Sequence, residues 1–266
     1  MLEYGYTYYI MYVGEHLGNP EKERIRRMTL EEAAQGTFEH PNNLLLYCDT
    51  HTTSSVAPPP PRVWHPHRLG CGTPTTLGVA PTPVRPFGIP DEHFEHLDGR
   101  ARMITKAPIR LLTLQALELN RHRVFWDIGS CTGSVSIEAR LQFPHLTVVS
   151  FEIRPEGKHL MDINTRRFGA PGITAVIGDF LQTNIDQYPR PDAVFIGGHG
   201  GHLKQLLAKV KEVLTPGGCI VFNSVSADSE AAFSEGTAEL GMTLHPSMHI
   251  ALNDYNPIKM MKAALS

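Results

Sequence analysis

The chain is poor in cysteine and contains no long apolar run. It has four cysteines in 266 residues, and none of them forms a Cys-x-x-Cys pair. This excludes a disulfide framework or a cysteine-rich zinc module as the organising principle. No stretch approaches the ~18 apolar residues of a membrane span, and the N-terminus lacks the cationic start of a secretory signal. These absences predict a soluble protein of the reducing cytoplasm.

A surplus of charge of one sign is also missing. The sequence has 24 Lys and Arg against 27 Asp and Glu, which gives a formal net charge of −3. Proteins that depend on attraction to phosphate backbones or anionic surfaces are usually basic, so neither nucleic acid nor a membrane is an expected partner. Hydrophobic residues make up 41% of the chain, which is enough for a packed core.

Proline divides the chain into three zones. Ten of the 33 residues from Pro58 to Pro90 are proline. Proline fixes φ and removes a backbone donor, so residues 52–86 are predicted to form an extended linker. Residues 1–51 precede this linker as a small αβ zone, and residues 87–266 follow it as the main domain.

The N-terminal zone predicts strand, helix, strand. Aromatic and β-branched residues at 8–13 and a short apolar run at 43–47 indicate the strands. Thr29 and Glu32 form a capping box for the helix between them. Two strands and one helix bury little core by themselves, so this zone is expected to be part of something larger.

The main domain alternates strands and helices. Strands are predicted at residues 123–128, 146–151, 173–177, 193–196, 219–223, 243–252 and 258–263, and helices from 133 onward and at 155–168, 203–214 and 227–240. This order predicts an α/β fold with a doubly wound, mostly parallel sheet that helices cover on both faces. Ligands of such sheets bind outside the carboxyl ends of the strands.

A loop of small residues, DIGSCTG, runs from Asp127 to Gly133 between the first strand of this domain and its helix. Small residues let the backbone approach a ligand, and a helix N-terminus offers free N–H groups. Three interpretations compete. A dinucleotide site would need glycines where Cys131 and Ser134 stand. A nucleophile elbow would use Cys131, with Asp179 and His245 as candidate partners. The third is the acidic-x-Gly-x-x-x-Gly loop of S-adenosylmethionine (SAM) methyltransferases.

Two further acids favour the third interpretation. Glu152 ends the second strand, where a carboxylate can accept hydrogen bonds from both ribose hydroxyls of a nucleoside. Asp179 follows the third strand and is placed to accept from the adenine amino group, with Phe180 packing on the ring. We therefore predict a SAM site with contacts from Asp127, Gly129, Ser130, Cys131, Thr132, Gly133, Glu152, Asp179 and Phe180.

The fourth strand is followed by a glycine-rich turn, GGHGGH, at residues 197–202. Its small residues predict an open floor for a substrate beside the methyl group, formed by Gly197, Gly198, Gly200 and Gly201. His199 is the candidate catalytic residue, either as a base or as a hydrogen-bond donor to a substrate carboxylate. The alternative is a plain turn with a solvent-facing imidazole. Closely spaced histidine pairs recur in the chain, but none belongs to a set with ligand spacing, so no metal site is predicted.

Several stretches together resemble the decarboxylating precorrin methyltransferases of cobalamin biosynthesis. They are FGIPDEHFEH at 87–96, MITK at 103–106, VFWDIGSCTGSVSIE at 124–138, FIGGHGG at 195–201 and the Asn256-Pro257 pair. The resemblance covers about residues 87–266. It implies a class I, Rossmann-like methyltransferase fold with SAM as cosubstrate, and it adds Thr105 to the residues that bind SAM.

The resemblance also implies the reaction. It is methyl transfer to carbon 15 of a precorrin or cobalt-precorrin, coupled to loss of CO2 from the ring C acetate. An electron-rich carbon attacks the sulfonium methyl in line, so positioning should matter more than a strong base. Related domains suggest a homo-oligomer.

The N-terminal zone carries a second resemblance. The stretches YVGEHLGNPE at 12–21, TLEE at 29–32 and NNLLL at 42–46 look like the C-terminal end of the carbon-5 precorrin methyltransferase. That domain precedes the decarboxylating one in bifunctional precorrin-6B C(5,15)-methyltransferases. Most of it, with its own SAM site, is absent here, so residues 1–51 are interpreted as a remnant and carbon-5 methylation by this chain alone is not expected.

Three rival interpretations remain open at this stage. One is a class I methyltransferase acting on RNA or protein, which the acidic balance weakens for RNA. Another is a non-catalytic assembly subunit that docks on a separate carbon-5 methyltransferase through the strand edges at 8–13 and 43–47. The third is a hydrolase that uses Cys131.

Overall fold

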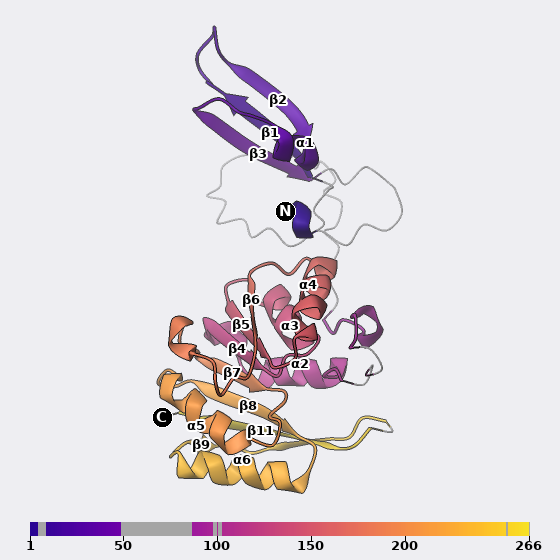
Figure 1. Ribbon diagram of the computed structural model, residues 1–266, viewed down its shortest axis with the longest axis vertical. Coiled ribbons are helices and arrows are strands. Elements are labelled where there is room, and N and C mark those ends of the chain that lie inside the picture. The colour runs from indigo at the N-terminus through magenta and orange to yellow at the C-terminus, as the bar shows by residue number, and fades with distance from the viewer. Residues whose placement is uncertain (5–8, 49–86, 98–99, 101–102, 254, 266) are drawn as a thin grey trace, which may run out of the picture. The chain divides into compact units, whose positions relative to one another are not determined.

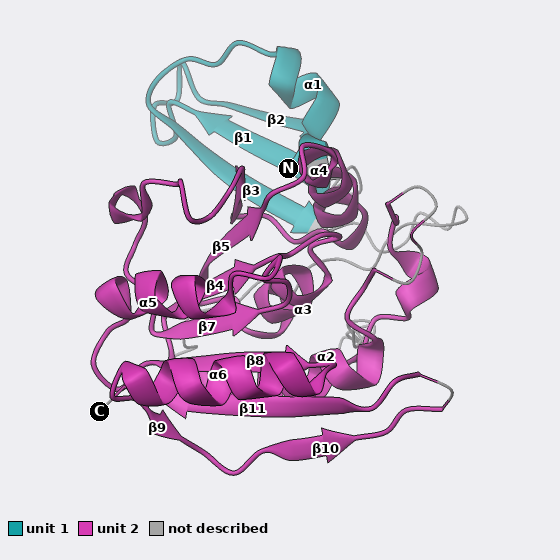
Figure 2. Cartoon of the chain, turned by 60° about the horizontal axis from the view of Figure 1, so that its bottom comes forward, with its two compact units in different colours: residues 1–85 teal, residues 86–266 magenta. Residues whose placement is uncertain are grey.

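The computed structural model describes residues 1–4, 9–48, 87–97, 100, 103–253 and 255–265 (Figure 1). The chain divides into two compact units, Met1–Arg85 and Pro86–Ser266 (Figure 2). The linker predicted for residues 52–86 lies outside the described residues.

Unit 1 contains a three-stranded antiparallel sheet in the order β2-β1-β3. Its elements are the 3-10 helix η1 (Leu2–Tyr4), β1 (Tyr9–Glu15), β2 (Arg24–Thr29), α1 (Leu30–Gln35) and β3 (Asn42–Cys48). The Thr29 hydroxyl accepts from the Glu32 amide at 3.1 Å, and the Glu32 carboxylate accepts from the Thr29 amide at 2.8 Å, so the predicted capping box is confirmed.

The prediction of strand, helix, strand for unit 1 was wrong in omitting β2. This strand reads RIRRMT and pairs only with β1, so it is an edge strand; Arg24, Ile25 and Arg27 are exposed, and the half-buried Arg26 pairs with Glu15. It therefore lacks the apolar alternation that marks a half-buried strand. Leu44, Leu45 and Tyr47 on β3 are exposed as well, and the buried apolar cluster of this unit contains Tyr9 and Leu30.

Unit 2 is built around an eight-stranded sheet in the order β10-β11-β8-β7-β4-β5-β6, with β9 paired to β11. Its strands are β4 (Val124–Ile128), β5 (Thr147–Glu152), β6 (Ile173–Ile177), β7 (Ala193–Ile196), β8 (Cys219–Ser224), β9 (Thr243–Leu244), β10 (Met248–Ile250) and β11 (Ile258–Ala264). The five strands β4 to β8 are parallel, and β9, β10 and β11 are antiparallel. The predicted mostly parallel α/β fold is confirmed, and each parallel strand lies within one residue of its predicted bounds.

Helices cover both faces of the sheet. They are α2 (Ala107–Ala116), α3 (Ser134–Gln142), α4 (Glu156–Phe168), α5 (Leu203–Val213) and α6 (Ala227–Glu239), with the 3-10 turns η2 (Asp91–His93), η3 (Leu119–Arg121) and η4 (Ile185–Gln187). Along β4, Phe125 packs with residues of α2 and α3, whereas Trp126 packs with residues of α5 and α6. Figure 2 shows α5 and α6 side by side on one face. Two layers of core therefore enclose the sheet.

Two elements of unit 2 differ from the prediction. Helix α2 was not predicted, although Pro108 in its first turn is a common helix start. The strand predicted at 243–252 is two short strands, β9 and β10, because Pro246 lies between them and cannot donate to a sheet. In the described part of the chain, no helix has the length and apolar character needed to cross a membrane.

Candidate functional site

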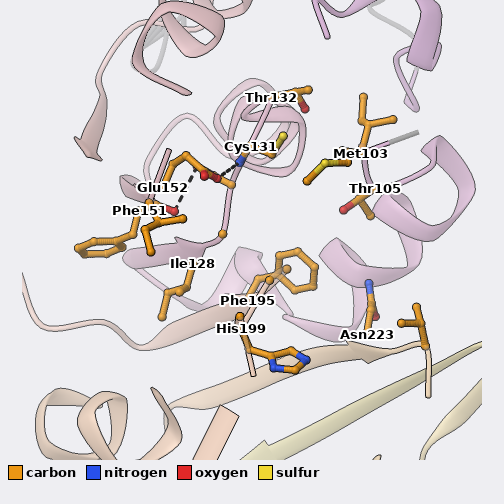
Figure 3. Close-up of a pocket in the computed structure, with 18 of the residues that line it drawn as sticks. Met103, Thr105, Ile128, Cys131, Thr132, Phe151, Glu152, Phe195, His199 and Asn223 are labelled. Carbon is orange, nitrogen blue, oxygen red and sulfur yellow. Dashed lines mark hydrogen bonds between the residues drawn. The ribbon is translucent and has the colours of Figure 1, made fainter. Parts of the chain in front are cut away.

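A cavity of about 690 Å³ lies at the carboxyl ends of the parallel strands. Its lining includes residues that directly follow β4, β5, β6 and β7, and Asn223 near the end of β8. Figure 3 labels Ile128 of β4, Glu152 of β5 and Asn223 among the lining residues. Its size is that of a pocket for a substantial small molecule. The fold therefore puts the strand-end motifs of the sequence around one space.

The loop from Gly129 to Gly133 forms one wall of this cavity. The amides of Gly129 and Ser130 donate to the Phe151 carbonyl at 2.8 and 3.1 Å, which ties the loop to β5. Gly129 has φ +77°, and a Cβ at this position would lie 2.6 Å from the Gly198 amide nitrogen. The loop after β4 and the turn after β7 thus approach each other through bare backbone.

Cys131 takes a left-handed conformation, with φ +49°, which non-glycine residues rarely adopt. The loop therefore keeps its turn although cysteine stands where many SAM loops have glycine. Burial, and then the neighbouring Glu152 carboxylate, raise the pKa of the thiol, so it stays protonated at neutral pH. His245 lines a different cavity, together with Asp192 and Cys219. The structure does not bring together the three residues of the nucleophile-elbow interpretation.

Glu152 is the buried acid of the cavity wall, with 1% of its surface exposed. Its Oε2 accepts from the Cys131 amide at 2.8 Å, as Figure 3 shows. Its Oε1 accepts from the Arg154 amide at 2.9 Å and from the Arg154 guanidinium at 3.0 Å. A Cβ at Gly157 would lie 2.4 Å from the Glu152 Cγ, so only glycine fits there in the first turn of α4. These hydrogen bonds use three of the about four lone-pair sites of the carboxylate and leave one on Oε2 for a ligand.

Asp179 and Phe180 follow β6 and line the same cavity. Asp179 Oδ1 accepts from the Leu181 amide at 2.9 Å, which fixes the turn. The Phe180 ring is buried and perpendicular to the Phe151 ring, with 4.9 Å between the centroids, and the Lys209 ammonium lies 5.4 Å from its centroid. The aromatic side chain is therefore held in one place beside the acids.

The structure places three of the predicted site residues outside the lining of the cavity. Asp127 is buried behind the loop, where its Oδ2 accepts from the Ser136 hydroxyl at 2.6 Å and amide at 3.2 Å. Burial raises the pKa of Asp127 to about 7, against the opposing effect of the Ser136 hydrogen bonds. Gly133 precedes α3 with φ +72°, and Gly201 is exposed. The other predicted residues lie together in the lining, namely Thr105, Gly129, Ser130, Cys131, Thr132, Glu152, Asp179, Phe180, Gly197, Gly198, His199 and Gly200.

His199 lies on the turn after β7 and contacts the Phe222 ring, with 5.7 Å between the ring centroids. Its Nδ1 accepts from the Gly201 amide at 3.2 Å. Burial, and then the nearby His202, lower the pKa of the imidazole, which keeps it neutral at pH 7. A neutral ring that accepts at Nδ1 carries its proton on Nε2, so Nε2 is a donor.

Sequence reasoning missed most of the wall formed by the segment before α2, strand β8 and the β10–β11 connection. It is formed by Met103, Ile104, Lys106, Asn223, Tyr255 and Asn256. The Met103–Lys106 and Asn256-Pro257 stretches carried the family resemblance, and this was the signal available in the sequence. In the described residues, no group of His, Cys, Asp and Glu is arranged to hold a metal ion.

A buried ion pair holds part of this wall. Arg110 on α2 is fully buried, and its Nε donates to the Glu138 carboxylate on α3 at 2.6 Å. Its Nη1 donates to the Thr105 carbonyl at 2.7 Å and to Asp91 Oδ1 at 3.2 Å. Breaking such a pair from one side usually costs about 3–5 kcal/mol, because a buried charge is left alone. Arg110 thus fixes the segment that carries Thr105 against the body of the unit.

Comparison with known proteins agrees with this geometry. Residues 92–264 match the family model described as "Precorrin methyltransferase domain". The chain belongs to this family of precorrin methyltransferases. The match spans the glycine loop, Glu152 and the turn after β7, so the family's sequence pattern includes the strand ends around the cavity.

Two curated relatives illustrate the similarity. A precorrin-6Y C(5,15)-methyltransferase [decarboxylating] from Sinorhizobium sp is 39% identical over 157 residues, which are 59% of this chain and 37% of that protein. A cobalt-precorrin-6B C(15)-methyltransferase (decarboxylating) from Salmonella typhimurium is 36% identical over 168 residues, 63% of this chain and 85% of that protein. The chain thus spans well under half of the first relative and most of the second.

A solved structure shares the fold. The precorrin-6y C5,15-methyltransferase from Geobacter metallireducens aligns with a TM-score of 0.61 at 31% identity, over 68% of this chain and 98% of that chain. The predicted class I methyltransferase fold and the predicted family are both confirmed.

Proposed function

We propose that this chain transfers a methyl group from SAM to carbon 15 of a precorrin or cobalt-precorrin and removes CO2 from the ring C acetate, a step of cobalamin biosynthesis. One observation carries the proposal. The buried Glu152 carboxylate and the glycine turn around His199 line a single cavity at the strand ends, within the residues that match the precorrin methyltransferase family. The proposed SAM site and the proposed substrate floor would thereby be adjacent.

The residues of the cavity fit SAM. Glu152 Oε2 keeps an acceptor site for a ribose hydroxyl, and the bare backbone at Gly129 admits close approach. The buried Thr132 hydroxyl, on the same loop, has no hydrogen-bond partner among the described residues. Buried polar atoms in native proteins nearly always have a hydrogen-bond partner, so the unpaired Thr132 hydroxyl supports a ligand beside the loop. When bound, SAM supplies an electrophilic methyl group.

The chain's own contribution is mainly to hold the two reactants in line. A carbon nucleophile on a conjugated macrocycle needs orientation more than proton removal. The Nε2 proton of His199 suits a hydrogen bond to a substrate carboxylate better than it suits general-base chemistry. We therefore favour the carboxylate role among the two proposed for this residue.

The proposal is restricted to carbon 15. The Salmonella relative, of which 85% is covered, is named for carbon 15 alone. The Sinorhizobium relative is named for carbons 5 and 15, and only 37% of its length is covered. A homo-oligomer, or an assembly with a separate carbon-5 methyltransferase, stays a prediction.

Calorimetric titration of the full chain with S-adenosylhomocysteine tests the cofactor part of the proposal. We expect binding by the unmodified chain and loss of binding in Glu152→Ala, because the ribose acceptor is gone. The second stage measures CO2 release from a precorrin or cobalt-precorrin in the presence of SAM. A folded chain that binds no S-adenosylhomocysteine, or one that binds it without releasing CO2, would contradict the proposal.

A further inference from the structure

The charged residues of the cavity lining are unevenly distributed. Among the described lining residues, the acids are Glu152, which ends β5, and Asp179, which follows the neighbouring strand β6. The cation Arg154 also lies there and pairs with Glu152. The side chains contributed by the Met103–Lys106 segment, β8 and the β10–β11 connection include one cation, Lys106, and no described acid. The part of the lining that includes Lys106 therefore favours an anionic ligand.

Lys106 has few partners for a charged group at the wall of a cavity. Its side chain is 17% exposed, and its Nζ lies 3.5 Å from Asp91 Oδ2. Direct charge-assisted bonds are about 2.7–2.9 Å long, so this contact is loose. Asp91 also serves Arg110 and the Ala107 amide through Oδ1. Among the described residues, the remaining partner of the ammonium is the Tyr255 ring, 5.1 Å away at its centroid.

We infer that Lys106 binds a carboxylate of the substrate and thereby orients the macrocycle against the methyl donor. This inference depends on the proposed function, because the acetate-bearing precorrin supplies the carboxylate. An ammonium has three N–H donors and no acceptor, so an incompletely paired one takes an anion. Partial burial strengthens such a pair over one at the open surface. Tyr255 packs over the ammonium and limits its access to water.

Lys106→Met tests the role, because methionine keeps most of the apolar stem and removes the charge. Lys158→Met is the matched control, since Lys158 on α4 is exposed and pairs only with Asp162 in the described structure. Uroporphyrin III, a tetrapyrrole with eight carboxylates, is the probe. It is titrated by absorbance into each full-length protein saturated with S-adenosylhomocysteine. We expect Lys106→Met to weaken porphyrin binding by about tenfold or more, and Lys158→Met to leave it unchanged.

Two further measurements separate a substrate role from a structural one. The affinity for S-adenosylhomocysteine should be unchanged in Lys106→Met, and Lys106→Arg should restore most porphyrin binding because it restores the charge. With a precorrin substrate, KM should rise in Lys106→Met more than kcat falls.

Three results would overturn the inference. They are porphyrin binding by Lys106→Met as tight as that of the unmodified chain, an equal loss of S-adenosylhomocysteine affinity, or no porphyrin binding by the unmodified chain. Failure of the proposed function would give a different result. In that case the unmodified chain would bind S-adenosylhomocysteine and the porphyrin but release no CO2 from a precorrin.

Discussion

Asp127 is a buried carboxylate that supports the cofactor loop from behind. Its Oδ2 accepts two hydrogen bonds from Ser136 in the first turn of α3, and its Oδ1 has no partner in the described structure. Desolvation of the charged form outweighs these bonds and raises its pKa to about 7. The carboxyl therefore joins β4 to α3 in its protonated form at mildly acid pH.

This shift predicts a pH dependence of stability. Because the pKa is raised in the folded state, the folded chain binds more protons than the unfolded chain between about pH 4 and 7. The contribution of Asp127 is thus fully present below pH 4 and is lost as pH rises to 7. Asp127→Asn keeps the acceptor for Ser136 and cannot ionise. The free energy of unfolding of the variant, relative to the unmodified chain, should rise by up to ~1.4 kcal/mol per pH unit across this window.

Urea unfolding at pH 4.5, 5.5, 6.5 and 8 measures the difference between the two proteins. A difference that does not change with pH would show that Asp127 is ionised in the folded chain throughout this range.

At the scale of elements, helix α4 packs closely on the end of strand β5 because residue 157 is a glycine and has no side chain. Gly157 lies in the first turn of α4 against the side chain of Glu152 at the end of β5. Glycine in a helix usually costs stability relative to alanine, by about 0.5–1 kcal/mol. Here it provides the space in which the carboxylate turns toward the loop.

Gly157→Ala should therefore affect binding more than helix stability. The new Cβ would lie 2.4 Å from the Glu152 Cγ, so the buried carboxylate must leave its contacts with Cys131 and Arg154. We expect the affinity for S-adenosylhomocysteine to fall by about tenfold or more, measured by calorimetry. Glu156→Ala, at the exposed neighbouring position, is the control and should bind normally. Equal affinities for both variants would mean that the carboxylate position is not needed for binding.

The elements differ in how far the sequence reveals them. Glu152 and the Gly129 loop follow strands with strong local patterns, so their position at one edge of a parallel sheet could be predicted. The contact between Lys106 and Tyr255 could not be predicted from the sequence. It depends on the packing of α2 against α3 through Arg110 and on the antiparallel pairing of β11 with β8. Such pairings between distant segments leave little local trace. The edge strand β2 was hidden for a different reason, since half of its residues are arginines and they do not alternate with apolar residues.

At the scale of the whole molecule, the cavity belongs to one unit. Its lining runs from Met103 to Ile258, entirely inside unit 2. Unit 2 also holds three of the four buried apolar clusters of the described structure. Domains with their own core generally fold by themselves.

We therefore expect residues 86–266, expressed alone, to fold and to bind S-adenosylhomocysteine with the affinity of the full chain. Calorimetry on the two proteins, together with circular dichroism, provides the measurement. Residues 1–48 alone should show no cooperative unfolding, because a three-stranded sheet with exposed Leu44, Leu45 and Tyr47 buries too little apolar surface. A well-folded 86–266 protein without affinity would show that unit 1 contributes to the site.

The contact between Gly129 and Gly198 has a consequence for how two ligands influence each other's binding. The loop after β4, proposed to bind the cofactor, and the turn after β7, proposed to bind the substrate, touch through backbone alone, so a shift of one displaces the other. Two ligands on these segments then share a coupling free energy, and linkage requires it to be reciprocal. If S-adenosylhomocysteine sets the turn for the tetrapyrrole, the tetrapyrrole must tighten the hold on S-adenosylhomocysteine by the same factor. Titrations of the two ligands in either order would then give the same coupling factor.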